Sequence, residues 1–147
     1  MSGPEDPKVF DLDQVSCNFL GTDIESGFGD GAAIMIKKAT PDFTTKVGAD
    51  GSVTRSKNGS QLYEVTITLL QTASGNAKLS AINLLDTSKP NGAGIGPLMI
   101  ADRQGTSLFF AKKAWIVQPP DVEYNQEVTN RAWTLAAVAN KNFIGGN

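Results

Sequence analysis

The sequence has no histidine and a single cysteine among its 147 residues. Without histidine the chain cannot form a Ser-His-Asp or Cys-His catalytic arrangement, a histidine-ligated metal site or an imidazole general base. Cys17 cannot form an internal disulfide, so we expect it to be a small, buried apolar side chain. Much of known enzyme chemistry is excluded by these two absences.

The chain also lacks an excess of either charge and any long apolar run. Its 13 Lys and Arg against 15 Asp and Glu leave a net charge of -2, so there is no general basic field for sequence-specific nucleic-acid binding. No stretch approaches the roughly 18 apolar residues of a membrane-spanning helix. Residues Met1–Asp6 do not resemble the basic start of a signal peptide. We expect a soluble, untargeted protein without membrane insertion.

Turn-forming residues are common, and apolar residues alternate with polar ones in most segments. The chain has 15 glycines and 7 prolines, and its length and hydrophobic content of 40% fit one globular domain, 1-147. A period of two is typical of strands that pack on one face. We therefore predict a mainly β fold with one helix. The expected strands cover residues 15–20, 32–38, 63–70, 98–101, 106–117 and 129–139.

A projecting hairpin is predicted over residues 42–58. Its centre is Asp50-Gly51, a pair that favours a type I′ turn, in which both central residues have positive φ. The arms are polar, and an isolated two-stranded ribbon with little apolar surface is marginally stable in water. We expect this hairpin to leave the domain and contact another surface.

The helix is predicted at about residues 74–87, with Ser74 as its N-cap and Pro90 beyond its end. Its apolar positions at helical spacing are Ala77, Ala81, Ile82, Leu84 and Leu85. The strand that precedes it, 63–70, shows the clearest alternation in the chain. One of its faces would carry Glu64, Thr66 and Thr68.

Three carboxylate pairs with i, i+2 spacing could support acid-base chemistry if they lay on strands. They are Asp11 with Asp13, Asp23 with Glu25, and Asp121 with Glu123. Solvated acidic edges explain the same residues. The run 92–96 resembles a phosphate-binding loop, but Pro97 and a strand follow it instead of a helix, which excludes that use.

Two basic doublets and two tryptophans have structural interpretations as well. Lys37-Lys38 and Lys112-Lys113 lie in expected strands, where adjacent residues point to opposite faces, so neither doublet forms a phosphate groove. We expect Trp115 and Trp133 to be core or interface anchors, because tryptophans serve this role more often than that of stacking platforms.

Charge is unevenly distributed along the chain. Residues 1–36 hold seven acids and one base, a balance of -6, whereas residues 37–57 hold five bases and two acids, a balance of +3. Either both segments are simply solvated, or the acidic surface of one copy complements the basic hairpin of another, head to tail.

The order of these segments resembles the tail tube protein family of contractile-tailed bacteriophages. The resemblance spans nearly the whole chain. It rests on residues 27–31 leading into 34–36, the turn 48–51, the strand 64–69, the helix residues 76–79, and the segments 97–102, 131–133 and 145–147.

The resemblance implies a β-sandwich or partial barrel with one flanking α-helix. Six subunits would form a ring in which inner strands join into one barrel, and rings would stack into a hollow tube in a contractile tail. The chain would then be a structural virion protein, not an enzyme, and would need no cofactor or metal. It would be assembled in the bacterial host cytoplasm and let the genome pass at ejection without sequence-specific DNA binding.

The implied partners are other copies of the chain, the tail sheath protein, the tape-measure protein, and the baseplate and tail terminator proteins. By the same resemblance, the hairpin would stack one ring on the next, with candidate contact residues Lys46, Asp50, Gly51, Arg55 and Lys57. Glu64, Thr66 and Thr68 would face the lumen.

Three other functions remain open from the sequence. A related effector-delivery tube would be built from similar rings. A carbohydrate-binding β-sandwich would use Trp115 or Trp133 with Asp121 or Glu123 on an exposed face. An acid-dependent hydrolase would use one of the carboxylate pairs.

Overall fold

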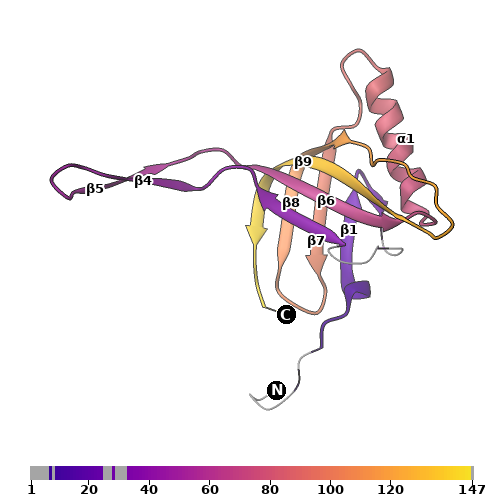
Figure 1. Ribbon diagram of the computed structural model, residues 1–147, viewed down its shortest axis with the longest axis horizontal. Coiled ribbons are helices and arrows are strands. Elements are labelled where there is room, and N and C mark those ends of the chain that lie inside the picture. The colour runs from indigo at the N-terminus through magenta and orange to yellow at the C-terminus, as the bar shows by residue number, and fades with distance from the viewer. Residues whose placement is uncertain (1–6, 8, 25–27, 29–32, 147) are drawn as a thin grey trace.

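The structure is a computed structural model that describes residues 7, 9–24, 28 and 33–146. A curled antiparallel sheet carries one helix at one end, and a long two-stranded ribbon extends from one side (Figure 1). The fold is therefore mainly β with one flanking helix, as predicted. Its elements are η1 (Leu12–Gln14), β1 (Val15–Phe19), β2 (Thr22–Asp23), β3 (Ile34–Lys38), β4 (Phe43–Val47), β5 (Val53–Lys57), β6 (Leu62–Leu70), α1 (Gly75–Ser88), β7 (Gly96–Asp102), β8 (Leu108–Gln118) and β9 (Asn130–Phe143).

The main sheet has seven strands in the order β2-β1-β7-β8-β9-β6-β3, and all neighbours are antiparallel. Every expected strand occurs, although β9 continues to Phe143 and the short β2 was not predicted. The sheet does not close into a barrel over the described residues. It is curled enough that Val15 of β1, the second strand in this order, and Ile36 of β3, the last strand, line one cavity. The architecture is β-sandwich-like.

The core lies on the concave face of this sheet and follows the period of two. Along β6 every second side chain from Tyr63 to Leu69 is buried, and the residues between them face outward. The largest fully buried side chains are Phe19, Phe109, Ile24, Ile67, Leu69, Leu79, Leu98, Leu135, Val65 and Cys17. Cys17 is thus a core residue, as expected, and burial raises the pKa of its thiol to about 12.

Helix α1 starts and ends within one residue of its expected bounds, but it packs differently. Its apolar positions Leu84 and Leu85 are exposed, and Leu79 is its one fully buried large side chain. The predicted apolar face is therefore wrong except at Ile82, which is partly buried against the core, whereas Ala77 and Ala81 are exposed like the two leucines. Ser74 occupies the N-cap position without a side-chain capping bond.

The start of α1 is attached to the sheet by hydrogen bonds of the Asn76 side chain. Its side-chain amide donates to the carbonyl oxygens of Leu70 at 2.8 Å and Ala73 at 3.2 Å. Its Oδ1 accepts a hydrogen bond of 3.0 Å from Trp133 Nε1. This buried amide links the start of α1 to Leu70 at the end of β6 and to Trp133 on β9. Among the described residues, no helix has the length and apolar character needed to cross a membrane.

Candidate functional site

The ribbon of β4 and β5 continues the ladder of β3 and β6 beyond the edge of the sheet. Ala39 donates its N–H to the Leu62 carbonyl at 3.0 Å, and Asn58 donates to the Asp42 carbonyl at 2.7 Å, so pairing carries on across the junction. Every residue of both strands is exposed. The predicted hairpin is thus present, it projects from the domain (Figure 1), and it buries nothing in the core of its own chain.

The strand register gives the ribbon two different faces, because directly paired residues share a face. The pairs Phe43↔Lys57, Thr45↔Arg55 and Val47↔Val53 lie on one face. This face, which we call the mixed face, combines three exposed apolar side chains with two cations. Arg55 lies over the Phe43 ring, with 4.2 Å between its guanidinium carbon and the ring centroid. The other face carries Thr44, Ser56, Lys46 and Thr54 and is polar throughout.

The ribbon turns at its tip in a way that differs from the prediction. Gly51 has a φ of 86°, but Asp50 is absent from the positive-φ residues, so the turn is not type I′. Gly51 donates its N–H to the Gly48 carbonyl at 3.0 Å, and Gly48 donates to the Ser52 carbonyl at 2.7 Å. This longer loop, with glycine in the left-handed region after a tight turn, is the next most common hairpin connection.

Asp50 stabilises this turn. Its Oδ1 accepts hydrogen bonds from the Ser52 hydroxyl at 2.7 Å and the Ser52 N–H at 3.0 Å, and these bonds lower the pKa of Asp50. Of the predicted stacking residues, the structure therefore brings Arg55 and Lys57 together on the mixed face. Lys46 lies on the opposite face, and Asp50 and Gly51 form the tip.

The outer face of β6 and its neighbours carries the residues predicted to face a lumen. Glu64 is exposed and lies opposite Lys37 on β3 and Ala136 on β9. Thr66 and Thr68 are half-buried, and Thr66 lies opposite Thr134. The short polar side chains of Thr66, Thr68 and Thr134 therefore lie next to Glu64 on the face of the sheet that points away from the core.

The two lysine doublets behave differently from each other. Lys37 points outward, whereas Lys38 reaches the inner residue Tyr63 and forms an ion pair with Asp42, so this doublet splits between faces as predicted. For Lys112 and Lys113 that prediction is wrong. The register slips from Ala111↔Ala139 to Lys113↔Val138, and this β-bulge leaves both lysines exposed between two buried alanines.

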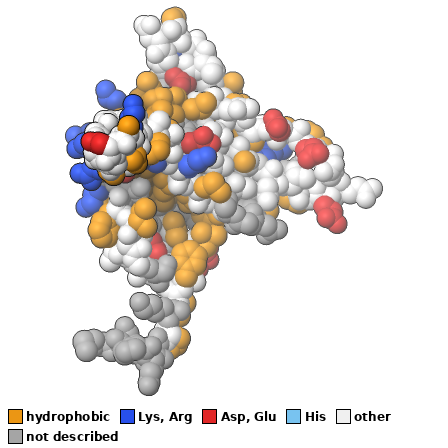
Figure 2. Space-filling model, turned by 60° about the vertical axis from the view of Figure 1, so that its left-hand side comes forward, with side chains coloured by type: hydrophobic (Ala, Val, Ile, Leu, Met, Phe, Trp, Pro, Cys, Tyr) orange, Lys and Arg blue, Asp and Glu red, His pale blue; other side chains and the backbone are white. Residues whose placement is uncertain are grey.

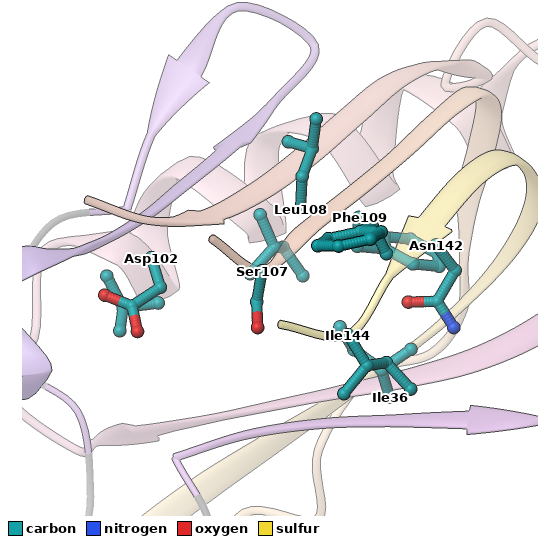
Figure 3. Close-up of a pocket in the computed structure, with 10 residues that line it drawn as sticks. Ile36, Asp102, Ser107, Leu108, Phe109, Asn142 and Ile144 are labelled. Atoms are coloured by element: carbon teal, nitrogen blue, oxygen red, sulfur yellow. The ribbon is translucent and has the colours of Figure 1, made fainter. Parts of the chain in front are cut away.

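An apolar cavity of about 260 Å³ opens where the two ends of the curled sheet approach each other. In Figure 3, Ile36 and Ile144 lie beside each other at its edge, and Asp102 and Asn142 lie at opposite sides. The Ser107 hydroxyl accepts a 2.9 Å hydrogen bond from Gly145 N–H, which ties the end of the chain to the β7–β8 loop. The cavity offers apolar packing and no acid-base pair.

Two of the three carboxylate pairs are described in full, and neither lies on a strand, so both lack the geometry required for a hydrolase. Asp11 caps η1 by accepting a hydrogen bond from Asp13 N–H at 3.0 Å. Asp121 and Glu123 are exposed in the β8–β9 connection. Glu25, the partner of Asp23, lies outside the described residues, as do most of residues 27–31. No group of three or more possible metal ligands occurs among the residues that the structure describes.

The glycine-rich run is occupied by the chain's own carboxylate. Asp86 Oδ1 accepts hydrogen bonds from Ala93 N–H at 2.8 Å and Gly94 N–H at 3.0 Å. A Cβ added at Gly94 would lie 2.7 Å from Asp86 Cβ, so the glycine is needed for this approach. The exclusion of a phosphate-binding loop agrees with this contact.

Trp133 is buried and hydrogen-bonded to Asn76, which makes it a core anchor as predicted and removes it as a carbohydrate platform. Trp115 is half-buried on the outer face of β8, opposite Ala136. Neither tryptophan lies in the β8–β9 connection with Asp121 and Glu123.

Sequence reasoning missed one surface feature. The β8–β9 connection, residues 119–129, exposes the apolar side chains Val122, Tyr124 and Val128 among its acids. The signal in the sequence is the alternation of acids with apolar residues after the pair Pro119-Pro120, in Asp121-Val122-Glu123-Tyr124.

Comparison with protein families gives a match over most of the chain. The family described as bacteriophage PhiTE tail tube protein matches residues 13–145. This range includes the ribbon, the whole curled sheet and α1.

Two individual proteins are also similar. Structural protein ORF10 of Pseudomonas phage KPP10 is 27% identical over 122 residues, which cover 83% of this chain and 70% of that protein. Among solved structures, the cryo-EM structure of the anti-feeding prophage cap, described as a tube-terminating cap, has a TM-score of 0.58 at 13% identity. The match covers 92% of this chain and 91% of that chain, and at this identity it supports the fold alone.

Proposed function

The chain belongs to the bacteriophage PhiTE tail tube protein family, and on that premise we propose that it forms hexameric rings that stack into a hollow tube for passage of the genome. Family membership identifies a structural protein of the phage virion and not an enzyme. The ring of six and the contractile tail follow from the resemblance of the sequence to tail tube proteins.

The observation that carries the proposal is the ribbon of β4 and β5. Ten strand residues leave the domain with all side chains exposed, although a ribbon of this kind is marginally stable alone. A monomer gains nothing from such an extension. A second copy that packs on it gives the ribbon its stability, so we assign it to stacking between rings.

The sheet edges support ring closure. β3 pairs only with β6, so its other edge presents free backbone groups over the described residues. Pairing of such an edge with a neighbouring subunit removes the hazard of an open sheet. In a closed ring the outer strip of Glu64, Thr66 and Thr68 faces the lumen. Short polar side chains there let DNA pass without strong attraction to the wall.

The remaining proposed partners follow from the position of the tube within a phage tail. The tube encloses the tape-measure protein, is surrounded by the sheath, and ends at the baseplate and the tail terminator. The tube-terminating cap with a similar fold is consistent with rings of related subunits along one axis. An effector-delivery tube is the second candidate, but the phage family and the phage relative favour the genome conduit.

Electron microscopy of the purified full chain tests the proposal. We expect six-fold rings and, at higher protein concentration, hollow tubes. Reversing Lys46, Arg55 and Lys57 together to glutamate should leave rings but shorten or abolish tubes, while thermal unfolding of the subunit stays unchanged. A particle that stays monomeric at every concentration would contradict the proposal. Tubes of unchanged length in the triple variant would exclude an electrostatic role for the ribbon.

A further inference from the structure

We propose that the mixed face of the ribbon docks on the β8–β9 connection, residues 119–129, of a second copy of the chain. This inference rests on the proposed function and names the surface that receives the ribbon. Both surfaces combine charge with exposed apolar side chains, and both are identified from the same chain.

The charges of the two surfaces are opposite. The mixed face holds two bases, Arg55 and Lys57, and no acid. Asp50 lies at the tip of the ribbon and is hydrogen-bonded to Ser52. The connection 119–129 holds three acids and no base. Its acids are Asp121, Glu123 and Glu127. Arg131 lies below it, with its guanidinium carbon 5.8 Å from the Tyr124 ring centroid, and the surface stays acidic when this cation is included.

The apolar side chains of the two surfaces also match. Phe43, Val47 and Val53 are exposed on the mixed face. Val122, Tyr124 and Val128 are exposed on the connection. An acidic loop that was only solvated would have no reason to present three large apolar side chains, whereas a docking surface buries them. The combined pattern of an apolar centre with opposite charges around it is typical of protein interfaces.

The connection offers a formed surface for this contact. Thr129 donates its N–H to Gln71 Oε1 at 3.2 Å, and Gln71 donates its N–H to the Thr129 carbonyl at 2.9 Å, so the end of the connection is fixed to the chain beside α1. A polar hollow of about 330 Å³ lies between the connection and β9, and Asp121 and Glu123 contribute to its wall. A guanidinium or ammonium group from the ribbon suits this hollow in size and charge.

The positions of the two surfaces favour contact between copies. Along the longest axis the ribbon forms one end of the molecule, and the β8–β9 connection lies at the other (Figure 1). Figure 2 shows Lys and Arg gathered around the forward-pointing ribbon and Asp and Glu gathered on the opposite side. Contact between unlike ends is heterologous, so it repeats from copy to copy and builds a ring, fibre or tube instead of a two-fold dimer.

The strength of one such contact is limited by its size. One face of a five-residue ribbon is smaller than the roughly 800 Å² that each partner contributes to a stable interface. We therefore expect monomers to associate weakly through it. A ring offers several ribbons to the next ring at once, and the linked contacts multiply.

A charge swap tests the proposal. The variants are R55E/K57E on the mixed face, D121K/E123K/E127K on the connection, and the variant that combines all five changes. We expect the first two variants each to shorten tubes about tenfold or more, because like charges then face each other, and the combined variant to restore them. Each variant must first show the wild-type thermal unfolding temperature. Unchanged tube length in the acidic-side variant, or no restoration in the combined variant, overturns the inference while leaving tube formation itself intact.

A cross-linking experiment keeps the test valid if a charge variant fails to fold. One preparation carries Val53→Cys and a second carries Val122→Cys, and the native Cys17 is too buried to react. After mixing and oxidation we expect a disulfide between the two preparations. The matched control replaces the second variant with Val138→Cys, an exposed valine on the outer sheet face. Equal cross-linking with Val122→Cys and Val138→Cys would overturn the inference, and a wild type that forms no rings or tubes would instead refute the proposed function.

Discussion

The sheet and the ribbon are built from the same kind of strands but differ completely in burial. Phe109 on β8 is 2% exposed, whereas Phe43 on β4 is 42% exposed. In the sheet, alternation places apolar residues on a common core; in the ribbon, it sorts side chains into a mixed face and a polar face. The difference teaches that strands form in the ribbon through local pairing without a core, and the contacts that we propose with a second copy explain why the chain keeps such an extension.

The test with the largest expected effect on stability removes a phenylalanine side chain from each region. Phe109→Ala should lower the free energy of unfolding by about 3 to 5 kcal/mol, because it leaves a cavity in the core. Phe43→Ala should lower it by less than about 1 kcal/mol, since it removes only an exposed ring and its contact with Arg55. Urea unfolding of the monomer gives both values. Similar losses would contradict the separation of the ribbon from the core.

Asn76 tests the polar contact that joins helix and sheet. Asn76→Ala should cost about 1 to 3 kcal/mol of unfolding free energy, because Trp133 Nε1 and the Leu70 carbonyl lose their partner in the interior. Asn91→Ala, at an exposed loop position, is the matched control and should change it by less than about 0.5 kcal/mol. Equal values for the two variants would show that α1 is held mainly by Leu79.

Alanine substitutions at two glycines, one in the sheet and one in the ribbon, compare the two regions with a smaller expected loss of stability. Gly21 has a φ of 76° and Gly51 a φ of 86°, and an added Cβ meets nothing within 4 Å at either site. Alanine therefore costs only backbone strain, about 1 kcal/mol. At Gly21, between β1 and β2, this strain should appear in global unfolding. At Gly51 it should leave global unfolding unchanged and instead speed amide hydrogen exchange at the ribbon tip. A global loss at Gly51 would mean that the ribbon unfolds with the core.

Cys17 gives the smallest effect on stability near neutral pH. Because its folded-state pKa is raised from 9.0 to about 12, the unfolded thiol ionises first as the pH rises. Its contribution to stability is complete below pH 9 and declines between pH 9 and 12. Thiol labelling at neutral pH should follow global unfolding. A cysteine introduced at Val53 should label at once, and rapid labelling of Cys17 would place it outside the core.

The strands could be predicted from the sequence because burial on one face forces a period of two. Tyr63 to Leu69 follow this pattern throughout. The same reasoning failed for α1, where the spacing of Leu84 and Leu85 indicated burial that this subunit does not provide. Apolar periodicity shows which residues share a face, but it does not show whether another element covers that face.

Only part of the candidate site could be predicted, because local residue patterns do not specify how strands pair. Asp50-Gly51 located the ribbon, yet the turn type depends on pairing geometry further along both strands. The split of Lys46 from Arg55 follows from the register, which residue types alone did not specify. The bulge that exposes both Lys112 and Lys113 depends on Asn140, whose side chain accepts the Lys112 N–H at 2.8 Å. Long-range contacts of this kind leave no local pattern.

Cryo-electron microscopy of tubes assembled from the full chain tests the central claim most directly. The account predicts that the ribbon of each subunit crosses the boundary between rings and lies on the β8–β9 connection of a subunit in the next ring. The side chains of Arg55 and Lys57 should then lie within about 4 Å of Asp121, Glu123 or Glu127. A tube in which the ribbon points into solvent, or rests on a different surface of the neighbour, would contradict it.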